Sequence, residues 1–159
     1  EKAERYAPFE GGYLPPLWLR ATTRAQLHSG SFQWDFIIDE MAGGQIGIGF
    51  LLQWDIGPDW GFFGYLGSST TAWPYDPLTG NVVRNTESME GGLPQFPDGR
   101  AGIVTVHLDL PRNAEGKARF SILGVDSQPI DLPESSVVLP AACLLGETQK
   151  VTLGRLQQK

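Results

Sequence analysis

Hydrophobic and polar residues alternate most clearly along residues 32–40 of this chain. Positions 32, 34, 36 and 38 are all large and apolar, and the first three of them are aromatic. The intervening positions carry Gln33, Asp35, Ile37 and Asp39. Because successive side chains of a β-strand point to opposite faces of a sheet, this pattern predicts a strand with one buried aromatic face.

A second strand is expected over residues 45–52, after the turn formed by Ala42, Gly43 and Gly44. The short connection predicts that this strand makes a hairpin with residues 32–40. Gly47 and Gly49 are two positions apart and therefore lie on one face of the strand. Two missing side chains on one face leave room for a bulky group, such as an aromatic ring, to lie across the sheet.

The strongest strand candidate is the segment 101–110, which is rich in β-branched residues and alternates throughout. Residues 111–116 contain Pro, Asn and Gly and predict a hairpin turn, from which residues 117–123 pair back. A further turn is expected at Gly124, Val125 and Asp126.

The other strands are shorter and are expected at residues 17–21, 61–66, 82–83, 137–144 and 148–153. Between them, residues 76–80 predict a turn, residues 85–100 a long loop, and residues 1–16 an extended arm. No segment has the period of a helix. About ten strands joined by hairpins predict an all-β antiparallel sandwich over residues 17–156.

Composition supports one folded domain. The chain has 159 residues, of which 41% are hydrophobic and 11% aromatic, so it is too apolar to be disordered. A chain of this length can bury a core without metals or disulfides. The net charge of −6 and the lack of a Lys/Arg cluster disfavour nucleic acids and anionic membranes as partners. No apolar run approaches the ~20 residues that span a bilayer.

Ligand-type residues do not have the spacing of a metal site. His28, His107 and the lone Cys143 match no zinc motif. Asp55 and Asp59 lack the run of oxygen ligands that a calcium loop needs, and no glycine-rich phosphate loop is present. We therefore predict no metal and no cofactor. Cys143 lies in an apolar run and is interpreted as a buried apolar residue.

Three blocks of residues follow each other in an order and spacing shared with a known family. The first is the aromatic strand 32–38, followed by Gly-Ile-Gly-Phe at 47–50. The second is Leu-Gly-Ser at 66–68, with Ala-Trp-Pro-Tyr-Asp at 72–76 and Thr-Gly at 79–80. The third comprises segments 104–110, 118–121, 137–141 and 151–153. Together the blocks resemble the SPRY domain, a concanavalin-like β-sandwich used as a protein-interaction module.

The departures from that family's pattern fall in turns. Pro74 replaces the usual Gly after the Trp, and Leu123-Gly124 replaces an Asn-Gly hairpin. Residues 98–102 replace a Gly-Asp pair. These changes leave the resemblance of the fold intact, but they bear on how a partner is bound.

The resemblance implies that the sandwich closes over Trp73 and Tyr75, and that the protein binds a partner without catalysis. We expect a peptide or a subunit surface to bind at one end of the sandwich, through loops 53–60, 67–76 and 85–100, because large aromatic residues in irregular loops are typical contact residues. The candidate contact residues are Trp54, Asp55, Trp60, Ser69, Thr70, Arg84, Phe96 and Arg100.

An enzyme is disfavoured by geometry, although concanavalin-like sandwiches also include glycosidases. Asp35 and Asp39 share one face of a strand, but four residues at ~3.3 Å each separate them by ~13 Å. Paired glycosidase carboxylates need about 5 to 9.5 Å. Glu40 points to the opposite face from Asp39, and the chain has no Gly-x-Ser-x-Gly elbow.

Two other functions stay open. The chain could be an accessory subunit buried in a large assembly, with residues 1–16 docking on a neighbour. It could also be a lectin-like carbohydrate-binding domain, because exposed Trp and Tyr rings stack on sugars. The start at Glu1 is compatible with a processed organellar or secreted protein, or with an excised domain, so the compartment of this predicted soluble protein stays open.

Overall fold

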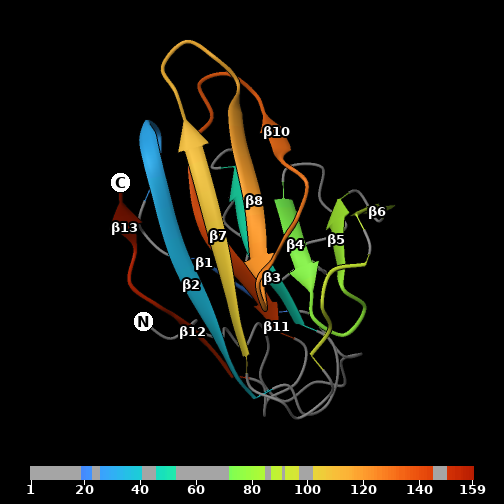
Figure 1. The fold of residues 1–159 in the computed structure, drawn as a ribbon. Helices are drawn as coiled ribbons and strands as arrows, with labels where there is room; N and C mark the ends of the chain where they lie inside the picture. Colours follow the sequence, from blue (N-terminus) through green and yellow to red (C-terminus); the bar gives the residue numbers. More distant parts are fainter. Residues whose placement is uncertain are drawn as a thin grey trace, which may run out of the picture.

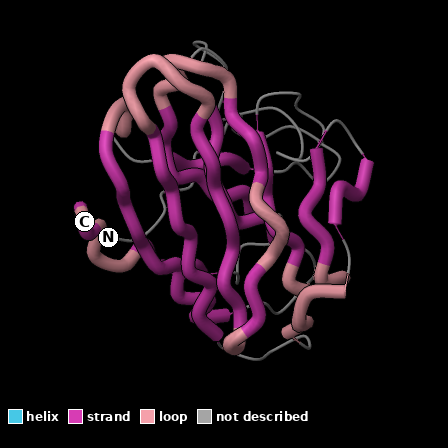
Figure 2. Tube along the Cα trace, turned by 45° about the horizontal axis from the view of Figure 1, so that its top comes forward, coloured by secondary structure: helices cyan, strands magenta, loops and turns pink. Residues whose placement is uncertain are grey.

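The computed structural model describes residues 19–22, 26–40, 46–52, 72–84, 87–90, 92–96, 102–144 and 150–159. Every regular element within these ranges is a β-strand. The strands form two antiparallel sheets that face each other (Figures 1 and 2). The predicted all-β antiparallel sandwich is therefore confirmed. The described residues include no helix that could cross a membrane.

The six-stranded sheet has the order β1-β11-β3-β4-β5-β6. Its strands are β1 (Leu19–Thr22), β11 (Val138–Leu144), β3 (Ile46–Leu52), β4 (Ala72–Asp76), β5 (Asn81–Arg84) and β6 (Glu87–Glu90). The seven-stranded sheet has the order β10-β8-β7-β2-β12, with β13 paired to β2 and β9 paired to β8. Its strands are β10 (Ile130–Leu132), β8 (Gly116–Ile122), β7 (Gly102–Leu110), β2 (Gly30–Glu40), β12 (Lys150–Leu153), β13 (Gln157–Gln158) and β9 (Val125–Asp126).

Strands β2 and β7 follow the alternation of their sequences. Phe32, Trp34, Phe36 and Ile38 are all buried, while the residues between them are half-buried or exposed. The same holds for β7, where Val104, Val106, Leu108 and Leu110 face the core and Ile103 remains 52% exposed. Both predicted strands and both predicted buried faces are confirmed, because the polar residues of each strand leave only one face fit for burial.

The predicted hairpin between residues 32–40 and 45–52 is wrong. β2 pairs with β7 and β12, whereas β3 pairs with β4 and β11 in the other sheet. Strands β11 and β12 are likewise in different sheets. A short connection can cross from one sheet to the other as readily as it can turn back. All seven residues of β3 are buried, which suits a central strand rather than the partner of a half-polar one.

Three local predictions also need correction. The predicted loop 85–100 contains the short strand β6, whose pairing with β5 no local pattern reveals. Val125 and Asp126 form β9, so the hairpin turn is Leu123-Gly124 alone. Strands β10 and β13 were not predicted, since each has only two or three residues. The predicted arm 1–16 and strand 61–66 lie outside the described residues.

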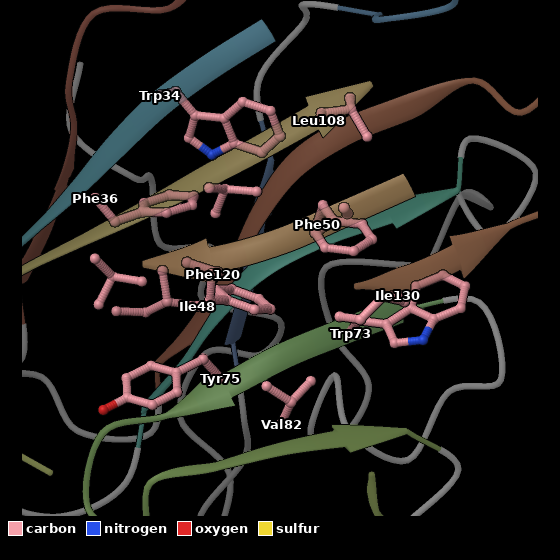
Figure 3. Packing of buried hydrophobic residues seen from close by; sticks show 14 of the residues in the cluster. Trp34, Phe36, Ile48, Phe50, Trp73, Tyr75, Val82, Leu108, Phe120 and Ile130 are labelled. Atoms are coloured by element: carbon pink, nitrogen blue, oxygen red, sulfur yellow. The ribbon is translucent and has the colours of Figure 1, made fainter. Parts of the chain in front are cut away.

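The core lies between the sheets and is rich in aromatic side chains. Figure 3 shows Phe50 of β3 and Tyr75 of β4 next to Phe120 of β8, with Trp34 and Phe36 of β2 in the same cluster. Trp73 and Tyr75, which were predicted to anchor the core, are 3% and 0% exposed. This prediction is confirmed. Rings of this size contribute most of the buried apolar area of a small domain, so they hold the two sheets together.

The turn between β8 and β9 carries an unusual residue. Leu123 and Gly124 have φ values of 50° and 79°, as both central residues of a type I′ hairpin do. Asn or Gly is favoured at the first of these positions, because other L-residues lose about 1–2 kcal/mol in the left-handed region. The Leu123 side chain is also 67% exposed, so it gains little by packing.

Leu123→Asn is therefore expected to raise the free energy of unfolding by about 1 kcal/mol. Urea denaturation followed by circular dichroism measures this change. Leu123→Ala is the matched control, because it removes the exposed side chain but keeps the strained backbone, and it should be close to neutral. Equal stabilities of the two variants would show that the turn conformation does not limit stability.

Candidate functional site

Two of the eight predicted contact residues are described by the structure. They are Arg84 and Phe96; the other six, Trp54, Asp55, Trp60, Ser69, Thr70 and Arg100, lie outside the described residues. The structure nevertheless describes the strands on either side of these residues. It therefore shows where the chain leaves the sandwich and where it re-enters it.

Arg84 lies at the end of β5, where its guanidinium group lies over an aromatic ring. Its guanidinium carbon is 5.1 Å from the centroid of the Trp73 ring. Trp73 is on the neighbouring strand β4. Because Tyr75 pairs with Val82 and the two strands are antiparallel, Arg84 lies opposite Trp73. A cation–π contact of this kind contributes about 0.5–2 kcal/mol, with the larger value for a desolvated pair. Arg84 is half-buried, so its position is set by the sandwich beneath it.

Behind Trp73, a series of stacked rings reaches across the core. Phe50 stacks on Trp73 with centroids 5.4 Å apart and on Phe120 with centroids 6.0 Å apart. Tyr75 follows at 6.1 Å from Phe120 in a tilted arrangement. Since Phe120 belongs to the opposite sheet, these contacts connect both sheets (Figure 3). The Arg84 end of the sandwich therefore rests on a rigid aromatic base.

The segment 53–71 connects two strand ends that are neighbours at this same end. Leu51 of β3 pairs with Ala72 of β4, so β3 ends where β4 begins. β5 runs antiparallel to β4, with Asn81 opposite Asp76 at the far end, and this returns Arg84 to the start of β4. Residues 53–71, which include five of the predicted contact residues, are thus attached on both sides next to Arg84.

Phe96 lies at the opposite end of β4. Its backbone N–H donates to the Pro77 carbonyl at 2.7 Å, and Leu93 N–H donates to the Gly80 carbonyl at 3.2 Å. The Tyr75 hydroxyl donates to the Pro94 carbonyl. Phe96 is only 4% exposed, so its ring packs in the core and does not present a contact surface. Leu93 is buried as well, so both side chains hold residues 92–96 against the core, and the prediction of Phe96 as a contact residue is wrong.

Residues 92–96 fold against the turn at residues 76–80, which the residue types of that segment predict. Leu78 N–H donates to the Asp76 carboxylate at 2.9 Å, and Gly80 N–H donates to the Asp76 carbonyl at 2.9 Å. Gly80 has a φ of 74°, and a Cβ there would collide with the Leu93 carbonyl oxygen. Burial, followed by the nearby Asp76 carboxylate, raises the pKa of Tyr75, which keeps its hydroxyl protonated as a donor.

Asp35 and Asp39, the carboxylates considered as a catalytic pair, accept hydrogen bonds from neighbouring hydroxyl groups. Thr105 Oγ1 donates to Asp35 Oδ1 at 2.7 Å, and Thr152 Oγ1 donates to Asp39 Oδ2 at 2.5 Å. Both hydrogen bonds link adjacent strands on the outward face of the seven-stranded sheet. Within the described ranges, no three His, Cys, Asp or Glu side chains are grouped in a way that could hold a metal ion.

A concave feature that the sequence did not point to lies on that outward face. We name it the outer hollow; its volume is about 330 Å³. Its lining includes Ser31, His107, Asp109, Lys117, Arg119 and Lys159. His107 and Asp109 are two positions apart in β7, so they share its outward face. The register of β8 and the position of the C-terminal segment, which no local pattern reveals, add the three cations.

Comparison with known proteins gives matches among solved structures. No protein-family model and no curated protein sequence matches the chain. The SPRY domain of human HERC1 superposes with a TM-score of 0.63 at 20% identity, covering 90% of this chain and 86% of that one. A human SPRY domain gives a TM-score of 0.66 at 14% identity, covering 89% and 87%. The TRIM65 PSpry domain gives 0.61 at 14% identity, covering 86% and 69%.

These similarities extend over most of the chain and concern the fold. Identities of 14–20% are too low to carry over a partner or a contact residue. The strand arrangement, however, agrees with the family that residues 32–38, 66–80 and 104–110 resemble. The chain therefore has the fold of a SPRY domain.

Proposed function

We propose that this chain is a non-catalytic protein-interaction module that binds a peptide or a subunit face of another protein. The proposed contact surface is the end of the sandwich at which β3 ends and β4 begins. It comprises Arg84 and the loop residues Trp54, Asp55, Trp60, Ser69 and Thr70.

The observation that carries this proposal is the position of Arg84 on Trp73. A cation held 5.1 Å above a buried ring stands beside the two strand ends that bracket residues 53–71. Two tryptophans in that segment would provide large apolar anchors next to a charged group on a rigid base. Aromatic and Arg side chains dominate the binding energy of protein interfaces. The SPRY fold supports an interaction module in general.

Phe96 is left out of the proposed surface, because it is buried at the far end of β4. Arg100 lies outside the described residues and stays a prediction that this proposal does not use. The proposed surface therefore consists of the loop between β3 and β4 together with Arg84 at the end of β5.

The contacts of Asp35 and Asp39 support a role without catalysis. Each carboxylate accepts a hydrogen bond from a threonine on a neighbouring strand. Both bonds therefore serve to join strands. A pair of carboxylates that acted as general acid and base would instead have to converge on a shared substrate position.

The double substitution Trp54→Ala with Trp60→Ala tests the proposal. Affinity purification from the native source, with mass spectrometry, first identifies the stoichiometric partner of the wild-type chain. The double variant is expected to bind that partner at least roughly 30-fold more weakly, because two interface anchors of this type contribute about 2 kcal/mol or more. Isothermal titration calorimetry measures the change, and circular dichroism checks that the variant is folded.

Ile103→Ala is the control, since Ile103 is 52% exposed on the outward face of the seven-stranded sheet. It should leave partner affinity unchanged. Unaltered binding by the Trp54 and Trp60 variant would refute the loop surface. Recovery of the wild-type chain as a bare monomer, together with specific signals on a glycan array, would replace the proposal by a carbohydrate-binding function.

A further inference from the structure

Three of the four basic residues that line the outer hollow, namely His107, Arg119 and Lys159, come together from separate parts of the chain. Cross-strand pairing places His107 of β7 between Gln33 of β2 and Arg119 of β8. The C-terminal segment runs beside β2 (Figure 1), and Lys159 N–H donates to the Ser31 carbonyl at 2.8 Å. This anchors the Lys159 side chain over β7, with its Nζ 3.5 Å from His107 Nδ1.

The carboxylates around the hollow are already engaged by other groups. Ser31 Oγ donates to Asp109 at 2.8 Å, and Thr105 Oγ1 donates to Asp35. On the other side, Asp131 pairs with Lys117 at 2.5 Å and Asp126 pairs with Arg119 at 3.1 Å. In the part of the chain that the structure describes, the Lys159 ammonium contacts an imidazole and no carboxylate.

The contact between Lys159 and His107 suits a neutral imidazole, because unprotonated Nδ1 can accept a hydrogen bond from the ammonium group, whereas a protonated imidazole would be repelled by it. Burial lowers the pKa of His107, and the charges of Arg119 and Lys159 lower it further. Asp126 and Asp35 oppose this change with smaller effects. The imidazole therefore resists protonation next to these cations. An anion placed between Lys159 and Arg119 would offset their positive charges and would therefore favour protonation of His107.

We propose that the outer hollow binds one carboxylate, the side chain of an Asp or Glu in an acidic segment of a partner protein. Lys159 holds it from one side and Arg119 from the other, through the guanidinium N–H groups that the pair with Asp126 does not use, and protonated His107 donates to it from below. A singly charged carboxylate suits the site better than a phosphate, because Asp109, which lines the hollow, and Asp35 and Asp126, whose charges act on His107, repel a dianion more strongly than a monoanion. This site is separate from the loop surface, so it does not depend on the proposed function.

The sign of the pH dependence follows from the charges. A bound carboxylate favours protonated His107 and raises its pKa. Affinity for the carboxylate is therefore highest below the pKa of free His107 and falls as pH rises through the higher pKa of the complex. A rise of about one pKa unit corresponds to binding that is about tenfold tighter at low pH than at neutral pH.

Nuclear magnetic resonance of the two histidines tests the inference. The chain has two His residues, and His28 is exposed on a connecting segment, so it serves as the internal reference. The probe is a capped Gly-Glu-Gly tripeptide, and Gly-Gln-Gly is its neutral match. The Glu peptide should raise the pKa of His107 by about one unit and leave His28 unchanged, whereas the Gln peptide should shift neither.

Three variants measure how much Lys159, Lys117 and His107 each contribute to binding of the Glu peptide. Lys159→Met should weaken binding of the Glu peptide about tenfold, because it removes the ammonium but keeps the side-chain length. Lys117→Met is the matched control; its lysine is committed to Asp131, so the loss should be about twofold or less. His107→Gln should retain binding and lose its pH dependence.

Several outcomes would overturn the inference. One is an unchanged His107 pKa at saturating Glu peptide, and another is an equal response to Gly-Gln-Gly. Equal losses for Lys159→Met and Lys117→Met would indicate general surface charge rather than a site. Tighter binding of inorganic phosphate than of the Glu peptide would contradict the assignment to a carboxylate.

Discussion

Gly49→Ala is expected to lower the free energy of unfolding by about 3 kcal/mol or more, at the upper end of what overpacking costs. Gly49 is in the central strand β3, between Pro74 of β4 and Ala141 of β11. A Cβ at this position would collide with the Trp73 carbonyl oxygen and lie 3.1 Å from Cζ of Phe120. The carbonyl belongs to a paired backbone, so it cannot move without disrupting the pairing of β3 with β4.

Urea denaturation of Gly49→Ala against wild type measures this loss. Gly92→Ala is the matched control, because a Cβ there meets nothing within 4 Å and only the φ of 81° opposes it. That strain costs about 1–2 kcal/mol. Equal losses for the two variants would mean that β3 and β4 separate easily, contrary to the close approach at Gly49.

Phe120→Ala is expected to destabilise the protein by about 3–5 kcal/mol, as truncation of a large buried ring does. Phe120 is fully buried and contacts Phe50 and Tyr75 of the opposite sheet at 6.0 and 6.1 Å between centroids. Removing the ring leaves a cavity at the junction of both sheets (Figure 3). A domain has only about 5–15 kcal/mol of stability in total, so this variant approaches the limit of folding.

Thermal and urea denaturation measure this effect, and Phe120→Leu keeps the test usable if Phe120→Ala does not fold. The Leu variant retains much of the volume and should lose less than the Ala variant, about 1.5 kcal/mol. Ile103→Ala, on the outward face of the neighbouring strand β7, should change stability by no more than about 0.5 kcal/mol. A loss at Phe120 as small as that at Ile103 would contradict the central position of this ring.

Some parts of the candidate sites were open to prediction from sequence. The turn at residues 76–80 and the core positions of Trp73 and Tyr75 follow from residue types and family resemblance. The position of Arg84 on Trp73 does not, because it depends on the register between β4 and β5. The burial of Phe96 depends on where residues 92–96 fold back, and an aromatic ring in a Pro- and Gly-rich segment is equally typical of a surface contact.

The outer hollow could be predicted from sequence even less than the position of Arg84. Residue 159 is distant in sequence from residues 107 and 119, and the local pattern of each segment is that of an ordinary solvated strand face. Only the pairing of β13 with β2 brings Lys159 to His107. Long-range pairings of this kind are specified by the whole packing arrangement and leave no local signal.

The sequence by itself determined the fold class of this protein and the buried faces of its long strands. Alternation in β2 and β7 was sufficient, since side-chain direction in a strand depends only on the parity of the position. The tertiary structure alone decided which strands share a sheet, as the separation of β2 from β3 shows. It also decided which charged groups meet. Strand pairing and these charge contacts both join residues far apart in the chain, so the gain from packing, rather than local preference, selects the partner.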